Sequence, residues 1–128
     1  MGTNPRRPGR PVGERLAVGR AGERVAAGFL EKRGYRVVGS GFLARRGELD
    51  LVCRHGDRLV IVEVKARSSD RYGSPAEAVG ERKRRALAAA AAEYRALAGW
   101  SGPIDFEVVS VRFGPDGRPA VELLDDVF

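Results

Sequence analysis

The chain has 128 residues, enough for one domain with a single hydrophobic core. Its apolar fraction of 43% is that of a globular protein, and no apolar run approaches the ~20 residues of a membrane span. The net charge of +6 favours a polyanion such as nucleic acid or an anionic membrane. No apolar signal-peptide core is evident, and the single cysteine, Cys53, excludes an internal disulfide, so we expect a cytoplasmic protein.

The N-terminal third predicts an arm, a helix and a strand. Residues 1–13 are rich in Pro, Gly and Arg without apolar periodicity, which predicts a disordered basic arm before one domain over 14–128. Apolar residues at helical spacing predict a helix from about Glu14 to Arg33, and Gly34 suits the left-handed position that follows it. Tyr35–Val38 is a short β-branched and aromatic run, typical of a strand.

The rest of the chain predicts a second helix and four further strands. Ser74-Pro75-Ala76-Glu77 has the N-cap, N1 and capping-box residues of a helix start, and the helix extends toward Ala98, with a break near Gly80 as the alternative. Trp100 is expected to pack as a hydrophobic cap after it. The predicted buried stripe of this helix is Leu87, Ala90, Ala91, Tyr94, Leu97 and Ala98. The predicted strands are Glu48–Arg54, Arg58–Ala66, Ile104–Phe113 and Ala120–Leu124.

The resulting order, α-β-β-β-α-β-β, predicts the α/β class. We expect a two-layer or three-layer sandwich around a mixed central sheet, because strands flank the second helix on both sides.

The two central strands form a predicted hairpin whose register follows from its turn. With Gly56-Asp57 as a two-residue loop, Asp50 lies opposite Glu63 and Glu48 lies opposite Lys65. Because side chains alternate, one face is wholly apolar and should be core: Leu49, Leu51, Cys53, Val60, Val62 and Val64. The other face carries Glu48, Asp50, Val52, Ile61, Glu63 and Lys65.

The charged end of that second face is a candidate metal site. Opposed Cβ atoms lie ~4.5–5.5 Å apart, so Asp50 and Glu63 would repel unless a cation or a proton lay between them. Two carboxylates suit Mg²⁺ or Mn²⁺, and Lys65 points to the same side. An exposed charge patch screened by Lys65 is the alternative. The continuous Leu-Val-Ile-Val run before Glu63 favours the site.

These residues resemble a known signature. Gly47-Glu48-Leu49-Asp50 followed by Glu63-Val64-Lys65 resembles the D…(D/E)-x-K pattern of the PD-(D/E)XK nuclease superfamily. More closely, residues 19–113 resemble the YraN-type family of small bacterial proteins, which is related in fold to archaeal Holliday junction resolvases. Further matching segments are Gly22-Glu23, Gly34-Tyr35, Tyr72-Gly73-Ser74-Pro75 and Lys83.

The resemblance implies a restriction-endonuclease-like fold and a role for each matched residue. Asp50 and Glu63 would be metal ligands, Lys65 the catalytic lysine, and Glu23 an accessory acid beside the metal. The chain departs from the family at Gly41-Phe42, where Asn precedes an aromatic residue in many members. It departs again at Asp105-Phe106-Glu107, where many members have Arg-Phe-Asp. The second change puts in doubt any ion pair or phosphate contact from that Arg.

The expected function is a Mg²⁺- or Mn²⁺-dependent endonuclease that hydrolyses phosphodiester bonds in DNA, with structure-selective cleavage as one form. Arg67, Arg71 and Lys83 are the expected phosphate contacts. The main alternative is a nucleic-acid-binding module with the nuclease fold but no catalysis, which would need no metal. A protein-interaction domain with a structural ion cluster is a third class and predicts no salt-dependent DNA affinity. Monomer and homodimer are both compatible with the sequence.

Overall fold

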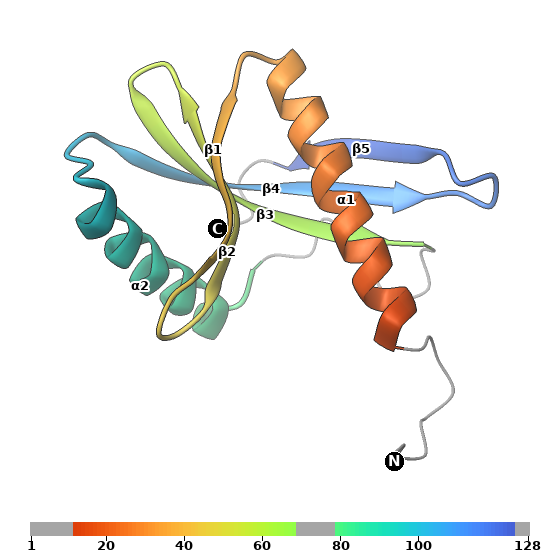
Figure 1. Ribbon diagram of the computed structural model, residues 1–128, viewed down its shortest axis with the longest axis horizontal. Helices are drawn as coiled ribbons and strands as arrows, with labels where there is room; N and C mark the ends of the chain where they lie inside the picture. Colours follow the sequence, from red (N-terminus) through yellow and green to blue (C-terminus); the bar gives the residue numbers. More distant parts are fainter. Residues whose placement is uncertain (1–11, 69–78, 125–128) are drawn as a thin grey trace.

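The computed structural model describes residues 12–68 and 79–124 (Figure 1). The predicted order of elements is confirmed, and in this part of the chain no helix is long and apolar enough to cross a membrane. The elements are α1 (Val12–Lys32), β1 (Arg36–Leu43), β2 (Glu48–His55), β3 (Arg58–Arg67), α2 (Glu81–Ala98), β4 (Ile104–Phe113) and β5 (Pro119–Leu124).

The strands form one mixed sheet in the order β1-β2-β3-β4-β5. The β1–β2, β2–β3 and β4–β5 pairs are antiparallel, whereas β3 and β4 are parallel. A parallel pair needs a crossover connection, and here the crossover contains α2. The predicted mixed sheet is therefore confirmed, with its parallel pair at β3, the strand that carries Glu63 and Lys65.

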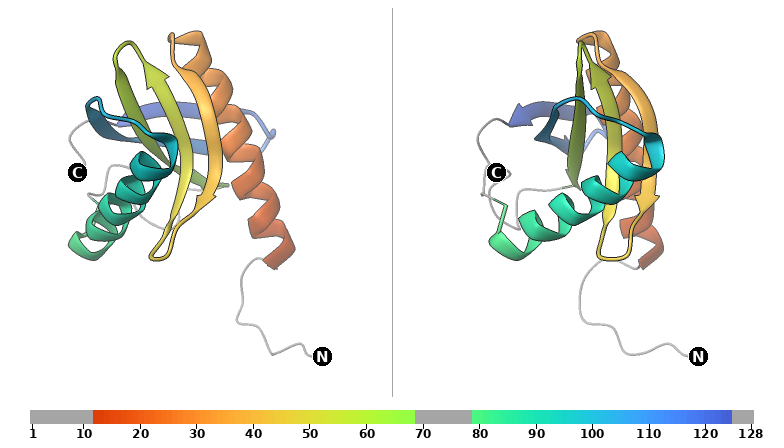
Figure 2. Two further views of the ribbon diagram at one scale, coloured as in Figure 1. Left: turned by 60° about the vertical axis from the view of Figure 1, so that its left-hand side comes forward. Right: turned by 90° about the vertical axis from the view of Figure 1, so that its left-hand side faces the viewer.

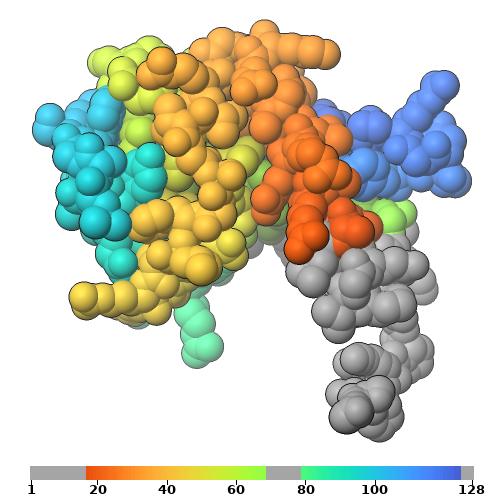
Figure 3. All heavy atoms as spheres, in the orientation of Figure 1, coloured from red at the N-terminus to blue at the C-terminus, as the bar shows by residue number. Residues whose placement is uncertain are grey.

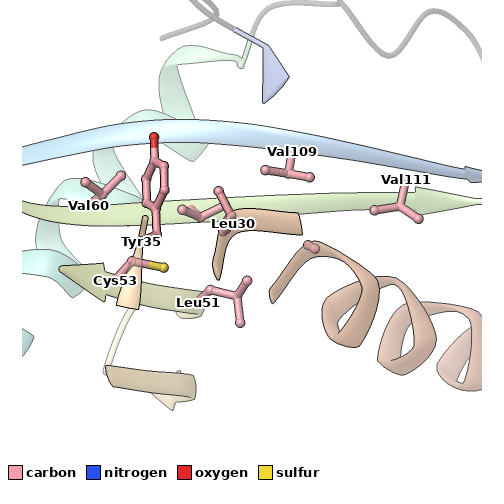
Figure 4. Packing of buried hydrophobic residues seen from close by; sticks show 9 residues of the cluster. Leu30, Tyr35, Leu51, Cys53, Val60, Val109 and Val111 are labelled. Carbon is pink, nitrogen blue, oxygen red and sulfur yellow. The ribbon is translucent and has the colours of Figure 1, made fainter. Parts of the chain in front are cut away.

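The two helices cover opposite faces of the sheet (Figures 1 and 2). Val62 packs in a cluster with Ala26 and Leu30 of α1, most of which is drawn in Figure 4. Its neighbour Ile61 packs instead in a second cluster with Leu87 of α2. Because consecutive strand residues point to opposite faces, the fold has three layers, with a separate core on each side of the sheet.

Three boundaries differ from the prediction by more than one residue. β1 continues to Leu43, five residues beyond the expected end at Val38. α2 begins at Glu81 with extended Gly80 as its N-cap, which agrees with the alternative of a break near Gly80, and the predicted capping box lies outside the described residues. α1 begins at Val12, two residues inside the stretch predicted as an arm, and residues 1–11 lie outside the described residues.

The end of α2 is more exposed than predicted. Leu87, Ala90 and Ala91 are buried as expected, but Leu97 is 77% exposed and Ala98 is also exposed. Trp100 packs against the second cluster in their place, and its indole N–H donates to the carbonyl oxygen of Pro103. The predicted role of Trp100 as a hydrophobic cap is confirmed. It closes this end of the core, which leaves the last turn of α2 in solvent.

Gly22 lets α1 approach β3 closely. A Cβ added at Gly22 would lie 2.4 Å from the Cβ of Ala66, closer than two carbon atoms can approach. We therefore expect Gly22→Ala to destabilise the fold by about 1–3 kcal/mol through overpacking, measured by urea denaturation. Gly19→Ala in the same helix is the control, since nothing lies within 4 Å of an added Cβ there. It should stabilise by about 0.5–1 kcal/mol. Equal stability of the two variants would contradict this packing.

Candidate functional site

The register of the β2–β3 hairpin agrees with the prediction. His55 pairs with Arg58 around Gly56-Asp57, and the ladder continues to Leu51 opposite Val62. Gly56 has a φ of +66°, which suits glycine in a tight turn. The pairing ends there, so the predicted pairs of Asp50 with Glu63 and Glu48 with Lys65 do not form, although both follow the same register.

Asp50 lies where the two strands separate. The backbone N–H of Val64 donates to Oδ2 of Asp50 at 2.8 Å, where a continued ladder would present a backbone carbonyl of β2. Leu49 packs in the α2-side cluster with Val52 and not on the Leu51 face, so its predicted face is wrong. Simple alternation is lost at this end of the hairpin because regular pairing to β3 stops at Leu51.

Glu63 is nearly buried and only half satisfied. Its side chain is 13% exposed, and its Oε2 lies 3.1 Å from Nζ of Lys83 in the first turn of α2. The other oxygen, Oε1, is buried and has no hydrogen-bond partner. An unsatisfied buried carboxylate oxygen is costly, and an additional cation would relieve that cost.

The environment of Asp50 disfavours its charge. Burial raises the pKa of Asp50 to about 7, and repulsion by Glu63 and Glu23 adds to the effect. The Val64 N–H bond and the Lys83 ammonium lower the pKa but do not offset the burial. A carboxyl that retains its proton near neutral pH beside a buried glutamate is a frequent feature of functional sites.

Glu23 and Glu48 extend this acidic group. Burial raises the pKa of Glu23, with further contributions from the charges of Glu48 and Glu63. This coupling places the α1 acid near the sheet carboxylates, as the resemblance implied. Among the described residues, however, no three His, Cys, Asp or Glu side chains converge to hold one ion. The arrangement fits Mg²⁺ or Mn²⁺ held by two carboxylates, because such ions usually retain several waters.

The predicted basic residues have different positions. Lys65 follows Glu63 by two residues on β3, so it shares that face, and it is partly buried. Arg67 is the last residue of β3 and is also partly buried. Lys83 lies at the site through its ion pair with Glu63. Arg71 lies outside the described residues. The site therefore brings together Asp50, Glu63, Lys83 and, electrostatically, Glu23.

An open groove beside the acids was missed by the sequence argument. It runs between α1 and the β1–β2 strands, seen in Figure 3 between the red-orange helix and the gold strands, and Arg20, Glu23 and Arg24 line it. Both arginines are exposed. Glu23 belongs both to the groove and to the acidic group, so the groove adjoins the candidate site. The spacing of four residues between the arginines, around Glu23, is the sequence signal that could have indicated it.

The two acids at the family departure have structural partners. Asp105 accepts a hydrogen bond at 2.9 Å from the guanidinium of Arg58, and Glu107 accepts one at 2.8 Å from the hydroxyl of Tyr35. Asp105 therefore links β4 to β3, and Glu107 links β4 to Tyr35, which follows the end of α1.

Comparison with known proteins places the chain in a family. Residues 22–111 match the model described as "Uncharacterised protein family UPF0102". The chain belongs to the UPF0102 family. A UPF0102 protein of Anaeromyxobacter dehalogenans is 48% identical over 109 residues, which cover 84% of this chain and 81% of the relative. One from Symbiobacterium thermophilum is 46% identical over 112 residues, covering 87% and 95%.

The UPF0102 match contains the residues of the candidate site. Glu23, Asp50, Glu63, Lys65 and Lys83 all fall within residues 22–111, as does Gly22 at the contact between α1 and β3. The YraN-type resemblance is thus confirmed at the level of the family.

Proposed function

We propose that this UPF0102 protein is a metal-dependent endonuclease of the PD-(D/E)XK type that hydrolyses phosphodiester bonds in DNA. The observation that carries the proposal is the carboxylate pair at the separation of β2 and β3. Glu63 has a buried oxygen without a partner, and Asp50 has a pKa raised to about 7 beside it. A divalent cation between the two side chains would coordinate the unpartnered oxygen of Glu63 and neutralise the charge of ionised Asp50.

Each residue of the candidate site would have a separate role in the reaction. Asp50 and Glu63 would hold Mg²⁺ or Mn²⁺, with Asp50 oriented by the Val64 N–H. When bound, the cation supplies a Lewis acid that activates water and neutralises charge on the scissile phosphate. Lys65 would orient the attacking water or stabilise the phosphate charge, because it shares the Glu63 face of β3. Glu23 would act as an accessory acid from α1.

Nucleic acid is the partner that the charges favour. The chain carries 23 Lys and Arg against 17 Asp and Glu, yet Glu23, Glu48, Asp50 and Glu63 lie close enough at the candidate site to influence one another's charge. A polyanion could approach these acids only along neighbouring basic surface, and Arg20 and Arg24 line a groove that adjoins them. Lys83 and Arg67 lie at the start of α2 and at the end of β3.

The direct test is cleavage of a panel of labelled linear, flapped and four-way DNAs with Mg²⁺ or Mn²⁺. We expect cleavage of at least one substrate that requires the metal and is lost in Asp50→Ala. Flapped or four-way DNA cut in preference to linear duplex would establish structure selectivity. Equal cleavage by wild type and Asp50→Ala would reveal a contaminating nuclease and contradict the assignment.

A nucleic-acid-binding module without catalysis is the second candidate. The observation that favours it is the absence, among the described residues, of a third acid converging with Asp50 and Glu63. This candidate predicts DNA binding that does not depend on metal and no cleavage in the same panel. The two candidates are therefore separated by the effect of adding and removing the divalent ion.

The groove gives a separate prediction for binding. The double variant Arg20→Ala/Arg24→Ala should weaken DNA binding and reduce the slope of log K against log salt by about 2, because each phosphate contact releases counterions. Arg118 in the β4–β5 connection is the matched control, since its side chain is 88% exposed and its ion pair is with Asp116. Fluorescence anisotropy at several salt concentrations measures both quantities. Equal slopes for the double variant and wild type would show that DNA does not contact the groove.

A further inference from the structure

The ion pair between Lys83 and Glu63 joins two elements at the candidate metal site. Nζ of Lys83 lies 3.1 Å from Oε2 of Glu63, so α2 contributes a positive charge to a carboxylate on β3. The two side chains differ in solvent exposure. The Lys83 side chain is 50% exposed, whereas that of Glu63 is 13% exposed. Lys83 is therefore the partner that can leave, and Glu63 is held in place by the sheet.

The ammonium compensates only part of the negative charge. Oε1 of Glu63 is buried without a partner, and Asp50, Glu23 and Glu63 repel one another. Lys83 acts on Asp50 as well as on Glu63, because its charge lowers the pKa of Asp50. Lys83 is thus a half-exposed lysine whose charge acts on both carboxylates that would hold a divalent cation.

We propose that Lys83 is the exchangeable counter-cation of the metal site, bound to Glu63 in the metal-free protein and displaced from it when Mg²⁺ or Mn²⁺ binds. The proposal rests on the proposed function, since it requires the metal. A dication on the Glu63 carboxylate would repel an ammonium that lies 3.1 Å from Oε2 of the same group, and this repulsion favours release of Lys83. An ion pair with a half-exposed lysine is weak enough to exchange. The displaced Lys83 then stays beside the metal, where it can contact a phosphate.

The test is titration of the full chain with Mn²⁺ by calorimetry, comparing wild type with Lys83→Met. Removal of the competing ammonium should tighten Mn²⁺ binding by about two- to five-fold, the range expected from a partly exposed ion pair. Lys83→Arg should restore the wild-type affinity, because it keeps the charge. Without metal, Lys83→Met should melt below wild type and gain more on addition of Mn²⁺.

The other two lysines are the matched controls. Lys32→Met, in the exposed last turn of α1, should leave Mn²⁺ affinity unchanged. Lys65→Met removes a charge on the Glu63 face of β3 without breaking the Lys83 pair, so its effect should be less than two-fold. If Lys65→Met tightened binding as much as Lys83→Met, the general field of the site and not direct exchange would be responsible, and the proposal would fail.

The remaining outcomes separate this proposal from the proposed function. If wild type binds Mn²⁺ and Lys83→Met binds it equally or more weakly, Lys83 does not compete with the metal. That result overturns the exchange proposal and leaves the endonuclease proposal intact. Failure of wild type and every variant to bind Mn²⁺ overturns both.

Discussion

Replacing Lys65 with methionine should lower the rate of metal-dependent DNA cleavage by ~10²–10⁴-fold, the usual range for a positioned proton donor or charge. The expected loss lies in turnover, because Lys65 acts on water or phosphate and does not hold the metal. Mn²⁺ affinity and DNA affinity should stay close to those of wild type. Single-turnover cleavage at saturating protein measures the rate separately from binding.

Lys32→Met is the control for this change, since it removes the same charge from the exposed end of α1. It should cleave at the wild-type rate. Unchanged turnover of Lys65→Met would show that Lys65 takes no part in catalysis. Loss of DNA binding by the same variant would show instead that Lys65 contacts the phosphate backbone.

Asp50→Asn should weaken metal binding but increase the stability of the folded chain. The variant should lose metal binding. At pH 8 without metal, however, its free energy of unfolding should be about 2–4 kcal/mol higher than that of wild type. The reason is the burial that raises the pKa of Asp50 to about 7, which penalises the ionised carboxylate. Asparagine keeps an acceptor for the Val64 N–H and carries no charge. A gain in stability on loss of a functional residue is a known trade-off.

The pH dependence has a definite sign. The folded chain holds the Asp50 proton up to about pH 7, whereas the unfolded chain releases it near 3.8. Between these values the folded state binds more protons, so the contribution of Asp50 to stability falls as pH rises from about 4 to 7 and is level above that. Urea denaturation at pH 5 and pH 8 should therefore show a larger advantage of Asp50→Asn at pH 8 than at pH 5. A wild type that is more stable than the variant at pH 8 would contradict this.

The central hairpin shows how far local sequence determines the site. Gly56-Asp57 fixes a two-residue turn, and the turn fixes the register from His55–Arg58 to Leu51–Val62. That register places Asp50 and Glu63 at corresponding positions where the strands separate. The order of the elements was also predictable, because each strand and helix has its own apolar period.

The remaining features depend on tertiary packing. The end of regular pairing at Leu51 follows from the Asp50 carboxylate bonding to Val64, a side-chain contact that periodicity does not contain. The Lys83–Glu63 pair depends on α2 beginning at Glu81, after the break near Gly80, whereas the helix-start signal at Ser74 lies outside the described residues. Leu97 has the correct helical spacing for burial, but Trp100 covers the core there.

The most direct test of the central claim is calorimetric titration of wild type and Asp50→Asn with Mn²⁺ at pH 8, where Asp50 is ionised. The carboxylate pair should bind Mn²⁺ weakly but measurably in wild type, and Asp50→Asn should show no binding because one charged ligand is gone. If wild type binds Mn²⁺ no better than Asp50→Asn, the pair is not a metal site, and the nucleic-acid-binding module takes the place of the endonuclease.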